Sequence, residues 1–160
     1  MTAATGSAAA RTVGVADDAA PTGGLDRYLV ELTKVVFQSG MGRAVVDAKW
    51  DGFMEAFDGF DPAHVAGLSP SDVDALVGDT RVIRNRRKIE ATIANAGRLL
   101  DLDGGAGDGS GVRSWLRSFE SEAARDRAVV DAFTFLGPGG VHQFLYGVGE
   151  SVSIDCEVTT

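Results

Sequence analysis

The chain has 160 residues, 44% hydrophobic and 24% charged, a mixture typical of one folded domain. Its 15 basic and 23 acidic residues give a net charge of −8, which excludes a surface coated with basic charge but not a local basic patch. The single cysteine excludes a disulfide within the chain, and no apolar stretch approaches the ~18–20 residues of a membrane span.

The first segment, residues 1–24, consists mostly of Ala, Gly, Thr and Ser without apolar periodicity. It has neither the basic start nor the apolar core of ~7–15 residues that a signal peptide has. We therefore expect a disordered leader over residues 1–24, a folded domain over 25–150 and a C-terminal tail over 151–160, in a cytoplasmic protein.

Apolar residues recur at helical spacing from Leu25 onward. Ser69 and Pro70 form a typical helix start, and the glycine-rich run 103–111 predicts a loop. The patterns predict a first helix from residue 25 that Gly40 and Gly42 interrupt near its end. Further helices are predicted over residues 43–57, 61–65, 70–77, 82–100, 112–119, 125–135 and 141–148, with a short extended segment over 151–158. The predicted fold class is all-α.

One candidate site is the segment FLGPGG at 135–140, where a glycine turn joins two predicted helices. Free backbone N–H groups at the start of a helix suit a phosphate oxygen, so Gly137, Gly139 and Gly140 are candidates for binding the DNA backbone. On this segment alone, a plain helix connection is the favoured alternative.

A second candidate is the basic block at 81–88, which holds five of the 15 basic residues. Its functional interpretation is a phosphate-facing patch made by Arg84, Arg86 and Lys88. The alternative, favoured on the block alone, is a solvated helix surface paired with acids such as Asp79 and Glu90.

The turn at 37–43 is a third candidate, since Phe37 or Gln38 could line a cleft there. The alternative is a helix connection with Phe37 in the core. We expect structural or surface roles for His64 and His142, and Cys156 is a lone thiol in the tail.

Taken in order, these segments resemble the DNA-3-methyladenine glycosylase I family of helix-hairpin-helix glycosylases, over roughly residues 25–150. The resemblance is carried by FQSGM (37–41), FDP (60–62), IRNR (83–86) with Lys88 and Ile89, and FTFLGP (133–138). It implies a compact all-α bundle that takes damaged bases out of double-stranded DNA and hydrolyses the N-glycosidic bond of 3-methyladenine, the first step of base excision repair.

The chain also departs from that family. Val35 stands where the family has a base-recognising glutamate, and Arg43 stands where it has a pocket tryptophan. The resemblance therefore implies a remodelled base pocket of Val35, Phe37, Gln38 and Arg43. Glu31, one helical turn (~5.4 Å) before Val35, is the candidate substitute for the glutamate.

The family's zinc ligands have no counterpart here apart from a displaced Cys156, so we expect no metal and no cofactor. The leading hypothesis is a glycosylase of alkylated purines in DNA with a remodelled pocket. The alternatives are a catalytically inactive DNA-binding pseudoenzyme and a protein-interaction module that does not bind DNA. We expect a monomer without a membrane partner.

Overall fold

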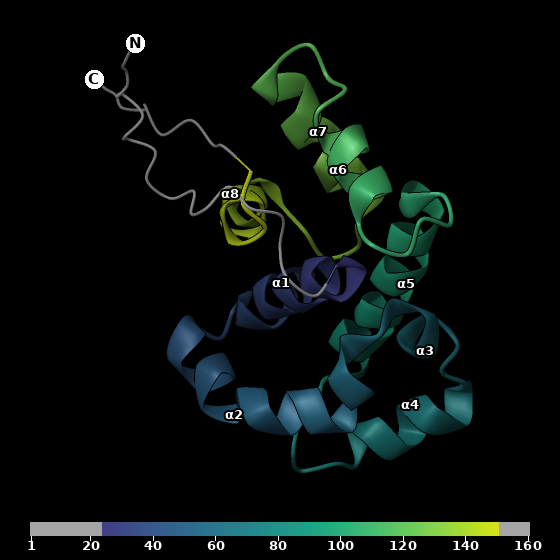
Figure 1. Cartoon of the computed structure of the whole chain (residues 1–160). Coiled ribbons are helices and arrows are strands. Elements are labelled where there is room, and N and C mark those ends of the chain that lie inside the picture. Colours follow the sequence, from purple (N-terminus) through teal and green to yellow (C-terminus); the bar gives the residue numbers. More distant parts are fainter. Residues whose placement is uncertain (1–23, 151–160) are drawn as a thin grey trace, which may run out of the picture.

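The computed structural model describes residues 24–150, and this part of the chain consists of helices and turns without a strand (Figure 1). It contains α1 (Leu25–Gln38), α2 (Arg43–Ala56), α3 (Pro62–Ala66), α4 (Pro70–Val77), α5 (Arg86–Asp103), α6 (Ser110–Leu116), α7 (Glu122–Ala132) and α8 (Pro138–Gly147), with a 3-10 turn η2 (Asp58–Phe60) after α2. The predicted all-α class is confirmed. None of these helices is both long and apolar enough to cross a membrane. The expected leader, tail and extended segment 151–158 lie outside the described residues.

Helix α1 lies in the middle of the fold. Its apolar residues at helical spacing, Tyr28, Leu29, Leu32, Val35 and Val36, are buried, and the helix packs against α5 and α8. Helices α2 to α4 lie on one side of α1 and α6 to α8 on the other, while α5 contacts members of both groups (Figure 1). Helix α1 is therefore in contact with both halves of the molecule.

Aromatic side chains fill the core between α1, α2 and η2. The ring of Trp50 stacks on Phe53 and Phe60, with centroids 5.1 and 5.2 Å apart, and Phe57 stacks on Phe60 at 4.9 Å. Phe37 meets Phe53 edge-on at 4.8 Å. Trp50 and Phe53 of α2 thus join aromatic residues of α1 and η2 in one cluster, because these side chains bury large apolar areas.

The predicted long helix begins later than expected, at Arg86 instead of residue 82. Asn85 has an extended backbone, and its side chain accepts the N–H of Lys88 at 3.2 Å, which is the geometry of an N-cap. Val82 and Ile83, just before the cap, are buried in a non-helical segment. Helical spacing of apolar residues alone does not show whether buried residues next to a helix belong to it.

The boundaries around the glycine turn also differ from the prediction. Helix α7 ends at Ala132, since Phe133 is extended and Phe135 has a φ of 66°. Helix α8 begins at Pro138, earlier than the expected residue 141. Proline at the first helical position lacks only an N–H that would have no partner within the helix.

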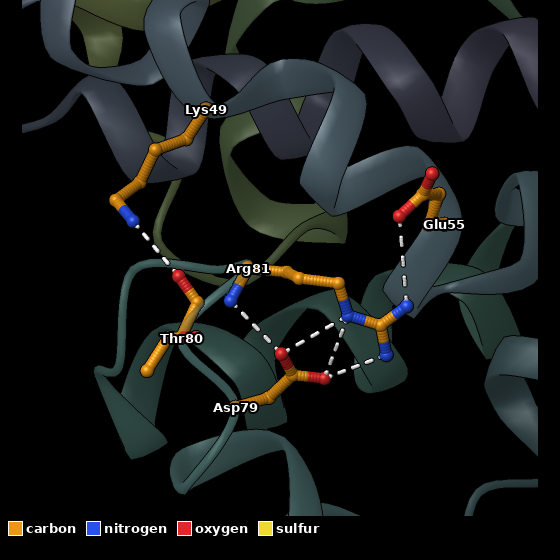
Figure 2. A network of polar contacts seen from close by, with 5 residues as sticks. All are labelled: Lys49, Glu55, Asp79, Thr80 and Arg81. Atoms are coloured by element: carbon orange, nitrogen blue, oxygen red, sulfur yellow. Dashed lines mark hydrogen bonds and ion pairs between the residues drawn. The ribbon is translucent and has the colours of Figure 1, made fainter.

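Polar contacts join α2 to the segment before α5 (Figure 2). Lys49 donates to the carbonyl oxygen of Thr80 at 2.9 Å, and the Arg81 guanidinium donates to Asp79 at 2.8 Å and lies 3.7 Å from Glu55. The Arg81 side chain holds the pKa of Asp79 below its usual range. Arg81, the first cation of the basic block, is thus part of a structural network.

Candidate functional site

A cavity of about 340 Å³ lies between the C-terminal end of α1, the α7–α8 turn and α8. It brings together residues that the sequence analysis singled out separately, namely Val35 and Gln38 on α1 and Gly137, Gly139 and Gly140 at the turn. Its other lining residues are Ser39, Phe135 and Gln143. We call this cavity the hairpin pocket.

Two glutamines face each other in the hairpin pocket. Nε2 of Gln143 donates a hydrogen bond to Oε1 of Gln38, and both side chains are half-buried. The amide nitrogen of Gln38 and the amide oxygen of Gln143 bond to nothing else among residues 24–150. The pair therefore offers one donor group and one acceptor on neighbouring side chains.

Gly140 determines how closely α8 approaches α1. A Cβ added there would lie 2.6 Å from Cγ1 of Val35 and 3.1 Å from Cδ1 of Leu136. At Gly137 and Gly139 an added Cβ would meet nothing within 4 Å. Gly140 is therefore a packing glycine, whereas the other two border open space.

The start of α8 presents free backbone donors at that open space. No side chain caps α8, and Pro138 contributes no N–H. The N–H groups of Gly140 and Val141 bond to the carbonyl of Gly137, but none of the described acceptors takes the N–H of Gly139. A free N–H at a helix start favours an anion.

The turn before α8 is fixed from α5. The Asn95 side chain, 1% exposed, accepts the N–H of Thr134 at 2.7 Å and donates to its carbonyl at 3.2 Å. The next residue, Phe135, is 39% exposed despite its size, and the Arg87 guanidinium lies 5.8 Å from the centre of its ring. The rim of the hairpin pocket thus combines an aromatic ring with a cation, a pair that the sequence analysis did not identify.

Two of the predicted pocket residues, Phe37 and Arg43, and the catalytic candidate Glu31 do not line the hairpin pocket. Phe37 is fully buried, and Arg43 is exposed at the start of α2. Glu31 pairs with Nε of Arg27 at 3.2 Å, and a Cβ on Gly147 would overlap its carboxylate. Glu31 therefore faces the C-terminal end of α8, away from the pocket. One helical turn separates it from Val35, and over that turn the neighbouring residue of α8 changes from Gly140 to Gly147.

The residues of the basic block have different surroundings in the folded protein. Arg84 and Arg87 are exposed and form no ion pair within the described part of the chain. Arg86, also exposed, lies 2.5 Å from Asp74 and 3.8 Å from Glu90, as the alternative interpretation expected. The patch is consequently smaller than the sequence suggests.

Lys88 requires a correction, since it does not share the surface of its neighbours. It is 7% exposed, and Nζ donates to the carbonyl oxygens of Phe37 at 3.3 Å and Ser39 at 2.5 Å. Burial lowers the pKa of Lys88. Its ammonium binds carbonyl oxygens at the C-terminal end of α1 and at the capping residue Ser39, where a cation also complements the helix dipole.

The histidines are on the surface, as expected. His64 is exposed, and Nε2 of His142 lies 3.0 Å from Asp126 on α7. Residues 24–150 contain no group of three or more potential metal ligands, and Cys156 lies outside the described residues.

Comparison with known proteins identifies relatives of this chain. The family model for methyladenine glycosylase matches residues 25–132. Over 66 residues, the chain is 38% identical to DNA-3-methyladenine glycosylase 1 of Escherichia coli (strain K12), a match covering 41% of this chain and 35% of that protein. The chain is also 35% identical over 66 residues to DNA-3-methyladenine glycosylase of Haemophilus influenzae, a match covering 41% of this chain and 36% of that protein. The matched part thus spans about a third of these curated relatives.

Solved structures agree on the fold. The 3-methyladenine DNA glycosylase I of Staphylococcus aureus has a TM-score of 0.67 at 23% identity, covering 82% of this chain and 81% of that one. A solution structure of a 3-methyladenine DNA glycosylase I has a TM-score of 0.64 at 25% identity, covering 81% and 79%. With a family model that matches most of its length, this chain belongs to the methyladenine glycosylase family.

Proposed function

We propose that this protein is a DNA glycosylase of base excision repair that hydrolyses the N-glycosidic bond of a modified purine in double-stranded DNA. The observation that carries the proposal is that the hairpin pocket opens beside the free N–H of Gly139 and beside Arg87, whose guanidinium lies over the ring of Phe135 and forms no ion pair within residues 24–150. A phosphate at the start of α8 would hold the DNA strand while a flipped base enters the pocket.

A base that carries a positive charge in DNA is a good leaving group, so its removal needs little acid or base catalysis from the protein. The bond between C1′ and the base nitrogen breaks with its electron pair going to the base. The oxygen of a water molecule bonds to C1′, and a proton of that water passes to solvent. No acidic side chain lines the hairpin pocket, so positioning and exclusion of bulk water would supply the rate enhancement.

Release of purines from methylated DNA tests this proposal. The purified protein is expected to release methylated bases above the spontaneous rate, and Gly139→Asp is expected to abolish release, because a carboxylate would face the phosphate. Gly139→Ala is the matched control, since an added Cβ meets nothing within 4 Å. Equal release by wild type and Gly139→Asp would contradict the proposed mode of DNA binding.

The variant Glu31→Gln tests whether Glu31 acts on the base, as the family resemblance implied, or lies outside the site, as its contacts in the structure indicate. We expect the rate of base release to stay within about twofold of wild type, since the carboxylate faces Arg27 and Gly147. A loss of about a hundredfold with unchanged thermal stability would show that Glu31 takes part in catalysis.

A second candidate is a pseudoenzyme that binds DNA without excision, and the absence of a carboxylate lining the hairpin pocket favours it. This candidate predicts duplex binding that Arg84→Ala weakens, with no base release above background. Absence of both binding and release would favour a module that does not bind DNA. We further propose a cytoplasmic monomer with double-stranded DNA as its partner and no cofactor.

A further inference from the structure

The lining of the hairpin pocket contains one aromatic residue, Phe135, and the backbone of this residue is strained. Its φ of 66° lies in the left-handed region, which costs free energy for a residue with a large side chain. The hydrogen bonds of Asn95 to Thr134 support this conformation, yet the Phe135 side chain stays exposed. Packing in the core does not account for such a position, and a strained, exposed residue at a pocket points to a function.

A cation already lies over the Phe135 ring. The guanidinium carbon of Arg87 is 5.8 Å from the ring centre, and an aromatic face attracts a cation within about 6 Å. A guanidinium is a planar, delocalised and weakly hydrated cation, and an N-methylated purine with a positive charge shares these properties. The ring thus accepts, within the protein itself, the kind of cation that such a base presents.

The rest of the lining offers little to distinguish a cationic base from a neutral one. It holds no carboxylate, and its polar side chains are Ser39 and the hydrogen-bonded amides of Gln38 and Gln143. Hydroxyls and amides contain both donors and acceptors, so they bind neutral and charged ligands alike. Among the lining residues, only Phe135 has an electron-rich face that favours positive charge.

We propose that Phe135 selects the base, in that a cationic methylated purine replaces the Arg87 guanidinium on the ring while Arg87 moves to a DNA phosphate. Two cations on one ring repel each other, so the base and Arg87 compete for it. A phosphate at the start of α8, beside the same pocket, binds a guanidinium by charge-assisted hydrogen bonds that are stronger than the ring contact. The inference rests on the proposed function, because it names the residue that selects the base of that same site.

Two bases of the same shape test the role of Phe135 without DNA. The probes are the 3,9-dimethyladenine cation and 3-deaza-3,9-dimethyladenine, an isostere that is neutral in mildly alkaline buffer. NMR follows the side-chain amide signals of Gln38 and Gln143 during titration with each probe. Wild type is expected to bind the cation about fivefold more tightly than the isostere. Phe135→Leu should bind both equally, and Phe135→Trp should keep the preference, because indole forms the strongest cation–π contact.

The ratio of the two affinities is measured within one protein, so partial unfolding of a variant does not distort it. Tyr146→Leu is the matched control, because Tyr146 is an exposed aromatic residue of α8 outside the lining. This variant should keep the fivefold preference. Equal affinities in wild type, or a preference that persists in Phe135→Leu, would overturn the inference.

Arg87→Gln tests the exchange of cations. It is expected to bind the cationic base about threefold more tightly, because no guanidinium competes for the ring, and to bind duplex DNA more weakly, because a phosphate contact is lost. Arg127→Gln removes the same charge at an exposed position of α7 and should leave base binding unchanged. Unchanged or weaker base binding by Arg87→Gln, or equal tightening in both variants, would contradict the exchange.

Binding of the free bases distinguishes failure of this inference from failure of the proposed function. A preference for the cation that Phe135→Leu removes supports the inference even if the protein releases no base from methylated DNA. Base release that Phe135→Leu leaves unchanged overturns the inference while the proposed function stands. Binding of neither probe also overturns it.

Discussion

Asn95 controls the α7–α8 turn through both polar atoms of its side chain. Its amide accepts the N–H and donates to the carbonyl of Thr134, 39 residues along the chain. Buried polar groups that lose such partners are costly, since they cannot recover hydrogen bonds from water. The next residue, Phe135, has a φ of 66°, which a side chain rarely adopts without support. Asn95 therefore supports both the turn and the rim of the hairpin pocket.

Asn95→Ala is expected to lower the free energy of unfolding by about 1–3 kcal/mol, because Thr134 loses both partners. Urea denaturation followed by circular dichroism measures this change. Arg98→Ala is the control, as Nε of Arg98 donates to the Ala132 carbonyl at the surface and its loss should cost less than about 0.5 kcal/mol. Equal losses in both variants would contradict the role given to Asn95.

Helices α1 and α8 meet at small residues, and this contact shapes one wall of the hairpin pocket. Gly140 faces Val35, and Gly147 faces Glu31 one turn earlier on α1. Because the backbones approach closely at both points, a larger residue at either position would push the helices apart. At the scale of elements, the pocket thus depends on two glycines of α8.

Neighbouring glycines of α8 make a matched pair for testing this contact. Gly140→Ala is expected to destabilise the protein by about 1–3 kcal/mol, since its Cβ would overlap Val35. Gly139→Ala, in open space on the same helix, should be neutral or slightly stabilising, because alanine favours the helix. Thermal unfolding of both variants measures the difference. A larger loss for Gly139→Ala would show that α8 packs differently.

The link between α2 and the segment before α5 is expected to depend on pH (Figure 2). The side chain and the N–H of Arg81 lower the pKa of Asp79 from its ordinary value of 3.8. The ionised carboxylate therefore adds stability above that ordinary value, and this contribution is lost as the pH falls through the lowered pKa. Asp79→Asn should be less stable than wild type at about pH 7, and the difference should shrink as the pH falls below 3.8. A difference independent of pH would contradict an ionic contribution.

Across the whole molecule, the net charge of −8 conceals an uneven distribution. Within the basic block, Arg81 and Arg86 form ion pairs with acidic side chains, and Lys88 donates to backbone carbonyl oxygens. Arg84 and Arg87 form no ion pair among the described residues, so they are the cations of the block that can bind a phosphate. Because few cations are available, the proposed DNA complex would depend on salt less steeply than complexes of strongly basic proteins.

We accordingly expect the logarithm of the DNA association constant to fall with the logarithm of salt concentration with a slope of about −2. Arg84→Ala should reduce the steepness by about 1, because one phosphate contact is lost. Gel shifts over a series of salt concentrations measure both slopes. A steep slope that Arg84→Ala leaves unchanged would place the contact surface elsewhere.

The sequence by itself determined the helical class, most of the elements and the family resemblance. Apolar periodicity, the Ser69–Pro70 helix start and the glycine loop act over a few residues, so local sequence reports them directly. The tertiary structure decided which residues share the site. Gln143 lies 105 residues from Gln38, and Glu31 and Lys88 are directed away from the roles that spacing suggested. Spacing predicts which face of a helix is buried, but only the packing of the other helices determines what that face meets.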